Sequence, residues 1–166
     1  MNSNNTCRVE HAPPRIALEF IAFGGPRPEL IAVSWPTAPG GVRRGALQRP
    51  ELLHFAPDRW LAPDPPAEVK ALLRAAVDAG AGVLVDATGK WQELVIAGPG
   101  AARLLASAIA VEAVLERRGC AAVTLFDCPA VLARLNEDFV LWVQSSYAAD
   151  FVATVERFRN TLQRET

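Results

Sequence analysis

This chain of 166 residues contains only three cysteines and two histidines, and its positive and negative charges are nearly balanced. The three cysteines, Cys7, Cys120 and Cys128, form an odd set without a C-x-x-C pair. That pattern argues against a disulfide framework, so we expect free thiols and a reducing, cytoplasmic compartment. Seventeen basic residues against eighteen acidic ones give a formal net charge of −1. A protein with this balance has no general attraction to nucleic acid or to an anionic membrane.

Long apolar runs are missing as well. The most apolar region, residues 94–115, is interrupted by Gly98, Pro99 and Gly100 and by charged residues. A membrane helix needs about 20 consecutive apolar residues, so none is expected here. The polar first 15 residues do not have the pattern of a secretory signal. A hydrophobic share of 51% with 21% charged residues excludes a disordered, collagen-like or coiled-coil chain. We expect a flexible tail over residues 1–13 and a single domain over residues 14–166.

Proline divides the chain unevenly, because eleven of the thirteen prolines precede residue 67. The first part should therefore contain short strands joined by rigid loops, with a long loop over residues 36–50. Residues 27–35 fit a short helix or a strand equally well. Short apolar stretches bounded by turn residues predict strands at 15–23, 51–56, 59–62, 82–87, 91–97, 120–126, 130–135 and 139–143.

Three helices are predicted from helical spacing and end signals. The first starts at Asp64 and Pro65, with Asp64 as the cap, and stops at Gly80. The second follows Gly98-Pro99-Gly100. The third is capped by Ser145 or Ser146, and its apolar seam is Tyr147, Phe151, Val155, Phe158 and Leu162. The turn at residues 88–90 predicts a hairpin of the two strands beside it, and residues 127–129 predict another.

An internal repeat relates the two parts of the chain. Residues 53–61 match residues 133–141 at an offset of 80, and each copy is a strand, a turn with Asp, a strand and then a helix. A weaker echo pairs residues 19–26 with residues 93–99. The sequence therefore predicts an α+β fold of two related strand-and-helix halves with mainly antiparallel sheet.

For the residues that could form an anion site or an acid–base site, we favour a structural role. Gly98-Pro99-Gly100 precedes a helix, but proline removes one of the N–H groups that an anion would need, so a turn is the better interpretation. Asp58, Asp86 and Asp138 could provide paired carboxylates. Two of them occupy equivalent turns of the repeat, where Asp commonly hydrogen-bonds backbone.

Metal and nucleophile sites are not indicated either. His11, His54, Cys120 and Cys128 show no standard metal spacing, and buried inert thiols are the favoured interpretation. A zinc ion or a disulfide at Cys120 and Cys128 is the alternative. Ser107, Ser145 and Ser146 lack a nearby histidine, and helix capping accounts for the last two. Most of the four tryptophans are expected in the core, and the alternative for one or two of them is a role as interface anchors; the four are Trp35, Trp60, Trp91 and Trp142. Trp91 is expected to be substantially buried beside residues 98–100.

The order of these elements carries a family resemblance. The segment V-L-V-D-A-T-G-K-W-Q-E-L-V-I-A-G-P-G-A-A-R-L-L, residues 83–105, resembles a signature of the aminomethyltransferase-like superfamily, which includes the glycine cleavage T-protein. The series also resembles the gamma subunits of heterotetrameric sarcosine oxidases. It contains L-L-H-F-A-P-D-R-W-L at 52–61, then Gly119-Cys120, and F-V-L-W-V-Q-S-S-Y-A at 139–148. The resemblance covers residues 15–160.

This resemblance implies a folate-binding-domain-like fold and a non-catalytic accessory subunit of a complex that oxidatively demethylates sarcosine or a related N-substituted amino acid. It implies no catalytic, cofactor or metal residues in this chain, with flavins, NAD and tetrahydrofolate on larger partner subunits. We also expect self-association of the isolated chain. The alternatives are a small folate-dependent aminomethyltransferase, disfavoured because a single module lacks the walls of a multidomain pocket, and a free-standing protein-binding module.

Overall fold

The computed structural model describes residues 6–24, 35–36, 38–116 and 118–164. The element predicted at residues 27–35 lies, apart from Trp35, outside the described residues. Contacts divide the chain into two compact units. Unit 1 comprises Met1–Pro14, Lys90–Arg117 and Ala122–Thr166, and unit 2 comprises Arg15–Gly89 and Arg118–Ala121. The single domain expected over residues 14–166 stays a prediction.

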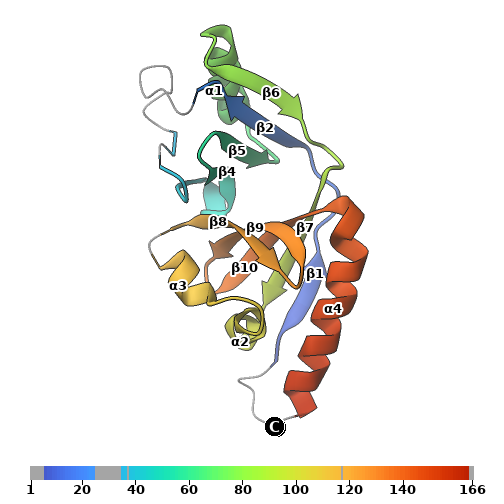
Figure 1. The fold of residues 1–166 in the computed structure, drawn as a ribbon. Helices are drawn as coiled ribbons and strands as arrows, with labels where there is room; N and C mark the ends of the chain where they lie inside the picture. Colours follow the sequence, from blue (N-terminus) through green and yellow to red (C-terminus); the bar gives the residue numbers. More distant parts are fainter. Residues whose placement is uncertain (1–5, 25–34, 37, 117, 165–166) are drawn as a thin grey trace. The chain divides into compact units, whose positions relative to one another are not determined.

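Unit 2 is built on a five-stranded antiparallel sheet of order β3-β4-β5-β2-β6. In chain order these strands are β2 (Ala17–Ala22), β3 (Val42–Arg44), β4 (Pro50–Ala56), β5 (Arg59–Pro63) and β6 (Gly82–Asp86). The helix α1 (Ala67–Asp78) packs on one face of the sheet (Figure 1). Gly82 lets β6 approach β2, because a Cβ there would meet the Ile21 carbonyl oxygen at 2.2 Å.

The core of unit 2 is aromatic. The rings of Phe20, Trp35 and Trp60 meet edge to face with centroids 5.1–5.7 Å apart. Val69 and Leu73 of α1 belong to the same core cluster, and both are fully buried. Edge-to-face ring pairs add about 0.5–1.5 kcal/mol each beyond the burial of their area. The aromatic rings thus form part of the buried core of the proline-rich part of the chain.

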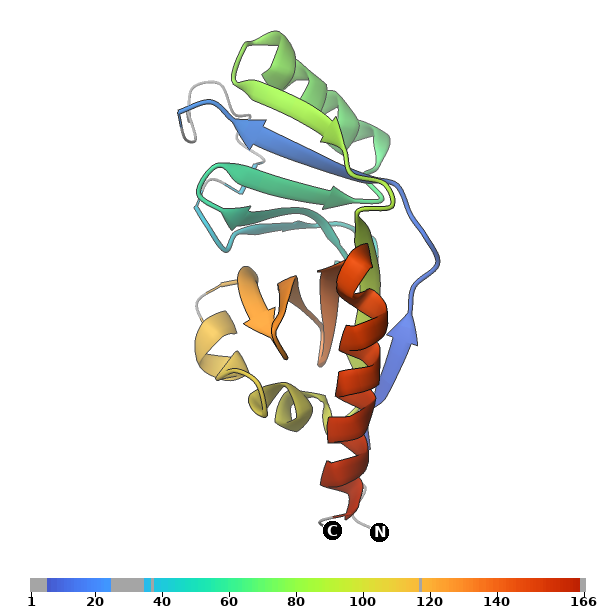
Figure 2. The same ribbon diagram turned by 45° about the vertical axis from the view of Figure 1, so that its right-hand side comes forward.

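Unit 1 has a sheet of order β1-β7-β10-β9-β8. Its strands are β1 (Arg8–His11), β7 (Trp91–Ala97), β8 (Cys120–Leu125), β9 (Cys128–Leu135) and β10 (Asp138–Gln144), and β8 belongs to this unit from Ala122 on. Its helices are α2 (Ala101–Ala106), α3 (Val111–Leu115) and α4 (Ser145–Arg164). Long α4 contacts β7 and β10, and both views show it running beside β1 and β7 (Figures 1 and 2). Among the described helices, none is long and apolar enough to cross a lipid bilayer.

The buried face of α4 differs from the predicted seam. Phe151 and Val155 are fully buried as predicted, but Tyr147 and Phe158 are about 40% exposed. Ala148 lies on the buried face instead. The seam prediction was therefore wrong at Tyr147, whereas Phe158 lies on the predicted side of the helix, where its ring contacts Phe126 with centroids 4.8 Å apart. A spacing of three and four residues marks one side of a helix, but the neighbouring elements decide how wide a stripe they cover.

The two units are built from related hairpin-and-helix elements, which confirms the predicted α+β fold with related halves. In each sheet an antiparallel hairpin, β4–β5 or β9–β10, is followed by an amphipathic helix, α1 or α4. The next strand in the sheet, β2 or β7, corresponds to the weaker echo in the sequence. The outermost strand is β6 in unit 2 and β1 in unit 1. The two sheets therefore have equivalent strand orders.

Four local predictions are corrected. Strands β6 and β7 do not form a hairpin, because β6 pairs with β2 whereas β7 pairs with β1 and β10. Residues 8–11 form a strand within the stretch expected to be a flexible tail. The predicted loop at 36–50 contains β3 and a short 3-10 helix, Ala46–Gln48. Finally, the cap residue of α1 is Pro66 instead of Asp64, with no side-chain capping bond.

Candidate functional site

A surface recess of about 460 Å³ in unit 1 is the best candidate for a binding site. It lies where the start of α2, the helix α3 and the β9–β10 hairpin come together. Its walls mix small residues with four charged side chains. The lining residues are Gly98, Pro99, Ala102, Glu112, Arg134, Glu137 and Asp138.

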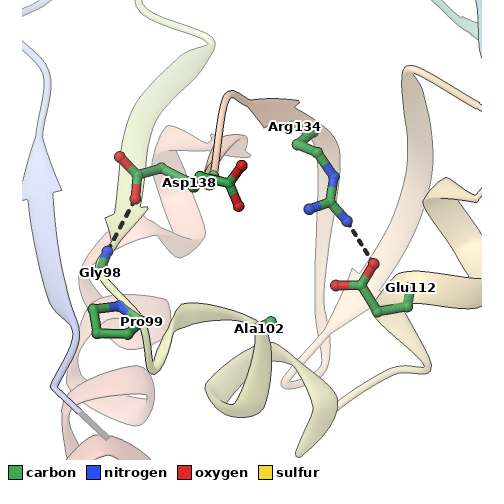
Figure 3. A pocket seen from close by; sticks show the side chains of 7 residues that line it. Gly98, Pro99, Ala102, Glu112, Arg134 and Asp138 are labelled. Atoms are coloured by element: carbon green, nitrogen blue, oxygen red, sulfur yellow. Dashed lines mark hydrogen bonds and ion pairs between the residues drawn. The ribbon is translucent and has the colours of Figure 1, made fainter. Parts of the chain in front are cut away.

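One wall of the recess is fixed by a hydrogen bond between distant residues. The N–H of Gly98 donates to Oδ1 of Asp138 at 2.9 Å (Figure 3). Gly98 has a φ of +101°, a conformation that side chains strongly disfavour. The N–H of Gly100 donates to the Thr6 carbonyl oxygen at 3.1 Å. These N–H groups are engaged within the protein, which supports the structural interpretation of Gly98-Pro99-Gly100 as a turn over the anion-site interpretation.

The opposite wall carries an ion pair. Nη2 of Arg134 lies 2.6 Å from Oε2 of Glu112 (Figure 3). The guanidinium also sits 5.0 Å from the centre of the Phe139 ring. Both charged side chains are partly solvent-exposed, so the pair contributes at most about 1 kcal/mol. It fixes the direction of the guanidinium more than it stabilises the fold.

The charges of the recess indicate what it could bind. Glu112, Glu137 and Asp138 contribute three carboxylates against the one guanidinium of Arg134. This balance favours an amine or another cationic group over an anion. Its seven lining residues include no hydroxyl, thiol, imidazole or amine side chain. Two of the carboxylates are already bound to protein groups, so the recess suits binding better than acid–base chemistry.

The three candidate aspartates have separate surroundings. Asp86 accepts a hydrogen bond of 2.9 Å from the N–H of Thr88. Hydrogen bonds from the Thr88 side chain and backbone lower the pKa of Asp86. Asp58 lies in the β4–β5 turn, where its carbonyl oxygen accepts from the N–H of Ala22. Asp138 differs from the predicted turn role, because it holds the backbone of a residue forty positions away and not its own turn.

Cys120 behaves as a buried thiol. Its Sγ donates weak hydrogen bonds to the carbonyl oxygens of Gly41 and His54, and burial raises its pKa to about 12. Burial also raises the pKa of Cys128 and of half-buried Cys7. All three cysteines are free, so the disulfide alternative is wrong.

Of the two histidines, only His54 packs in the core. The His54 ring is fully buried and stacks on Trp60 with centroids 4.1 Å apart. Burial lowers the pKa of His54, which keeps the ring neutral. His11 is exposed in β1. Among the described residues, no group of three or more His, Cys, Asp or Glu side chains could hold a metal ion. Ser107 donates to the Arg103 carbonyl oxygen, and Ser145 and Ser146 start α4.

The tryptophans separate into two classes. Trp35, Trp60 and Trp142 are buried, as predicted for core residues. Trp91 is only half-buried, with the Lys90 ammonium 5.0 Å from the centre of its ring. The expectation that Trp91 is substantially buried was therefore too strong.

The sequence predicted only some of the residues that line the recess. Asp138 and Gly98 were singled out by the repeat and the glycine–proline turn. Glu112 and Arg134 were missed, since no local motif links a short helix to a strand 22 residues later. Their pairing depends on the tertiary fold.

Comparison with known proteins places the fold. No protein-family model matches the chain, and the search of curated proteins found no match. Among solved structures, the chain is similar to a chain of the heterotetrameric sarcosine oxidase from Corynebacterium sp. U-96, solved in complex with pyrrole 2-carboxylate. The TM-score is 0.75 at 18% sequence identity, and the match covers 96% of this chain and 86% of that chain. The protein therefore has the fold of a chain from a heterotetrameric sarcosine oxidase.

Proposed function

We propose that this chain is a non-catalytic, gamma-like accessory subunit of a sarcosine-oxidase-like flavoprotein complex. The complex would oxidatively demethylate sarcosine or a related N-substituted amino acid in the cytoplasm. The observation that carries the proposal is the fold likeness, which runs through 96% of the chain to a member of a heterotetrameric oxidase. Because the match also covers 86% of that chain, the two chains are similar in length. The likeness is therefore to a small subunit as a whole, not to one domain of a large one.

The surface of the chain supports a binding role. Strand β6 lies at the edge of its sheet and presents Val83 and Val85, which are 39% and 42% exposed. Exposed apolar side chains on an edge strand are typical of surfaces that another protein covers. The larger subunits would bind the flavins, NAD and tetrahydrofolate, and this chain would bind none of them. Its contribution would be to hold those subunits in their active arrangement.

Co-expression with the flavin-binding subunits from the same source tests the proposal. A tagged copy of this chain should co-purify them in a constant ratio, and the complex should demethylate sarcosine or a close relative. The flavin-binding subunits expressed without this chain should lose stability or activity. Failure to co-purify any flavoprotein subunit would refute the proposal.

The isolated chain provides the second arm of the test. It should show no flavin absorbance and no turnover of an N-methyl amino acid with tetrahydrofolate. Turnover by the chain alone would instead support the aminomethyltransferase alternative.

A further inference from the structure

Strand β1 is the outermost strand of its sheet, but in the sequence it lies far from the other strands of that sheet. In unit 2 the outermost strand, β6, follows the helix α1. In unit 1 the equivalent place beside β7 is filled by β1, which precedes the rest of that unit by about 80 residues. The outermost strand of the unit 1 sheet is thus a segment that is separated in the sequence from the rest of unit 1.

The contacts of β1 are mainly backbone contacts. Its four residues pair antiparallel with β7, from Arg8 opposite Ala97 to His11 opposite Leu94. The pairing continues beyond the strand, where the N–H of Ala12 donates to the Glu93 carbonyl oxygen at 3.1 Å. Three of the four side chains in β1 are exposed, and only Val9 is half-buried. A strand held in this way contributes backbone hydrogen bonds that any copy of the same segment can supply.

Two further contacts define the docking site at either end of β1. Nε2 of Gln92 donates to the Ala12 carbonyl oxygen at 3.1 Å. At the other end the segment passes close to Gly98, where a Cβ would meet the Thr6 carbonyl oxygen at 2.8 Å. The edge of β7 is therefore shaped to accept an extended backbone with a fixed register.

The connection after β1 favours exchange between molecules. Five residues, 12–16, join β1 in unit 1 to β2 in unit 2, and two of them are Pro13 and Pro14. Consecutive prolines fix φ and keep the preceding residue extended, so this connection is stiff. Short, stiff hinges favour the swapping of an element between identical chains.

We propose that the β7 edge accepts β1 of a second copy of this chain, giving a strand-exchanged dimer at high protein concentration. Each copy then donates its β1 to the sheet of the other in the register seen within one chain. This inference concerns self-association of the isolated chain and does not depend on the proposed function.

Engineered cysteines at one cross-strand pair test the proposal in the full chain. Glu10 lies opposite Val95, and both positions are at least partly exposed. Opposed residues of an antiparallel pair are about 5.5 Å apart between Cα atoms, within disulfide reach. In a Cys7→Ser background, a Glu10→Cys chain and a Val95→Cys chain are mixed, unfolded, refolded at high concentration and oxidised. Exchange predicts a covalent 10–95 link between chains, found by peptide mass spectrometry, in a species of twice the monomer mass.

Three controls make the result decisive. A Val83→Cys chain in place of Val95→Cys should give no preferred link to position 10, because residue 83 lies opposite Ile21 of β2 in its own sheet and not opposite β1. A single chain with both Glu10→Cys and Val95→Cys, refolded at high dilution, should form the link within itself. Replacing Pro13 and Pro14 with alanine should lower the dimer fraction. If the mixed chains formed no 10–95 link, or formed it no more often than the 10–83 link, the proposal would be overturned.

Discussion

The Asp138 carboxylate accepts a 2.9 Å hydrogen bond from the backbone N–H of Gly98, which ties the start of β10 to the turn before α2. Asp138→Ala leaves that N–H without its acceptor, and we expect a loss of about 1–3 kcal/mol in the free energy of unfolding. Asp138→Asn keeps an oxygen acceptor and should lose less. Glu137→Ala, in the adjacent exposed turn, is the matched control and should be nearly neutral. Equal urea stability of the alanine and asparagine variants would contradict this role for the carboxylate.

His54 should make stability depend on pH. Burial lowers its pKa in the folded state, so the unfolded chain binds more protons between that value and the usual pKa of about 6.5. Stability is then fully present above about pH 6.5 and is lost as the pH falls below it, by at most about 1.4 kcal/mol per pH unit.

Urea unfolding at several pH values between neutral and mildly acidic checks this expectation. His54→Phe removes the titrating group and keeps a ring that can stack on Trp60, so its stability should vary less with pH over that range. His11→Phe, at an exposed position, is the matched control for removing a histidine. A His54→Phe variant with an unaltered pH dependence would rule out the histidine as its source.

The repeat shows how far the sequence could predict the fold. The match between residues 53–61 and 133–141 predicted two hairpins, each followed by a helix, and both are present. The pairing of β6 and β7 was mispredicted, because the turn at 88–90 separates two apolar strands in the way that a hairpin turn does. Their real partners, β2 for one and β1 and β10 for the other, lie far away in the sequence. Local turn chemistry cannot distinguish these cases.

Strand β1 and the recess could not be predicted from the sequence for a related reason. Three of the four residues of β1 are polar and exposed, so no apolar alternation marks it as a strand. In the recess, the Arg134–Glu112 pair joins β9 to α3 without a sequence motif. Residues 51–63 were predicted well because each strand there carries its own apolar pattern and the turn at 57–58 has typical turn residues.

Trp60 and Trp91 should differ in their contribution to stability. Trp60 is fully buried, and its Nε1 donates to the Pro36 carbonyl oxygen at 3.0 Å, so Trp60→Ala should cost about 3–5 kcal/mol. Trp91 is half-buried, and Trp91→Ala should cost clearly less. Thermal melts followed by circular dichroism can rank the two. A Trp91→Ala variant as unstable as Trp60→Ala would show that the half-exposed ring carries a full core contribution.

The last prediction concerns the exposed edge of β6. Val83 and Val85 project from the side of the strand opposite Leu84, which packs against the core of unit 2. If larger flavoprotein subunits cover this edge, removing the two apolar side chains should weaken the complex without unfolding the chain. Threonine is the suitable replacement, because it keeps the β-branched shape that a strand favours.

The Val83→Thr, Val85→Thr double variant should keep a melting temperature close to that of the parent chain, since both side chains are already partly in water. Its Kd for the flavin-binding subunits should rise at least tenfold, equivalent to about 1.4 kcal/mol of binding free energy. Tyr147→Ser is the control, because Tyr147 is exposed to a similar degree but lies on α4 of unit 1. The contrary outcome is a valine variant that binds as tightly as the parent while Tyr147→Ser binds more weakly. The subunit interface would then lie on α4 instead, because a side chain that the partner buries is the one whose removal lowers the affinity.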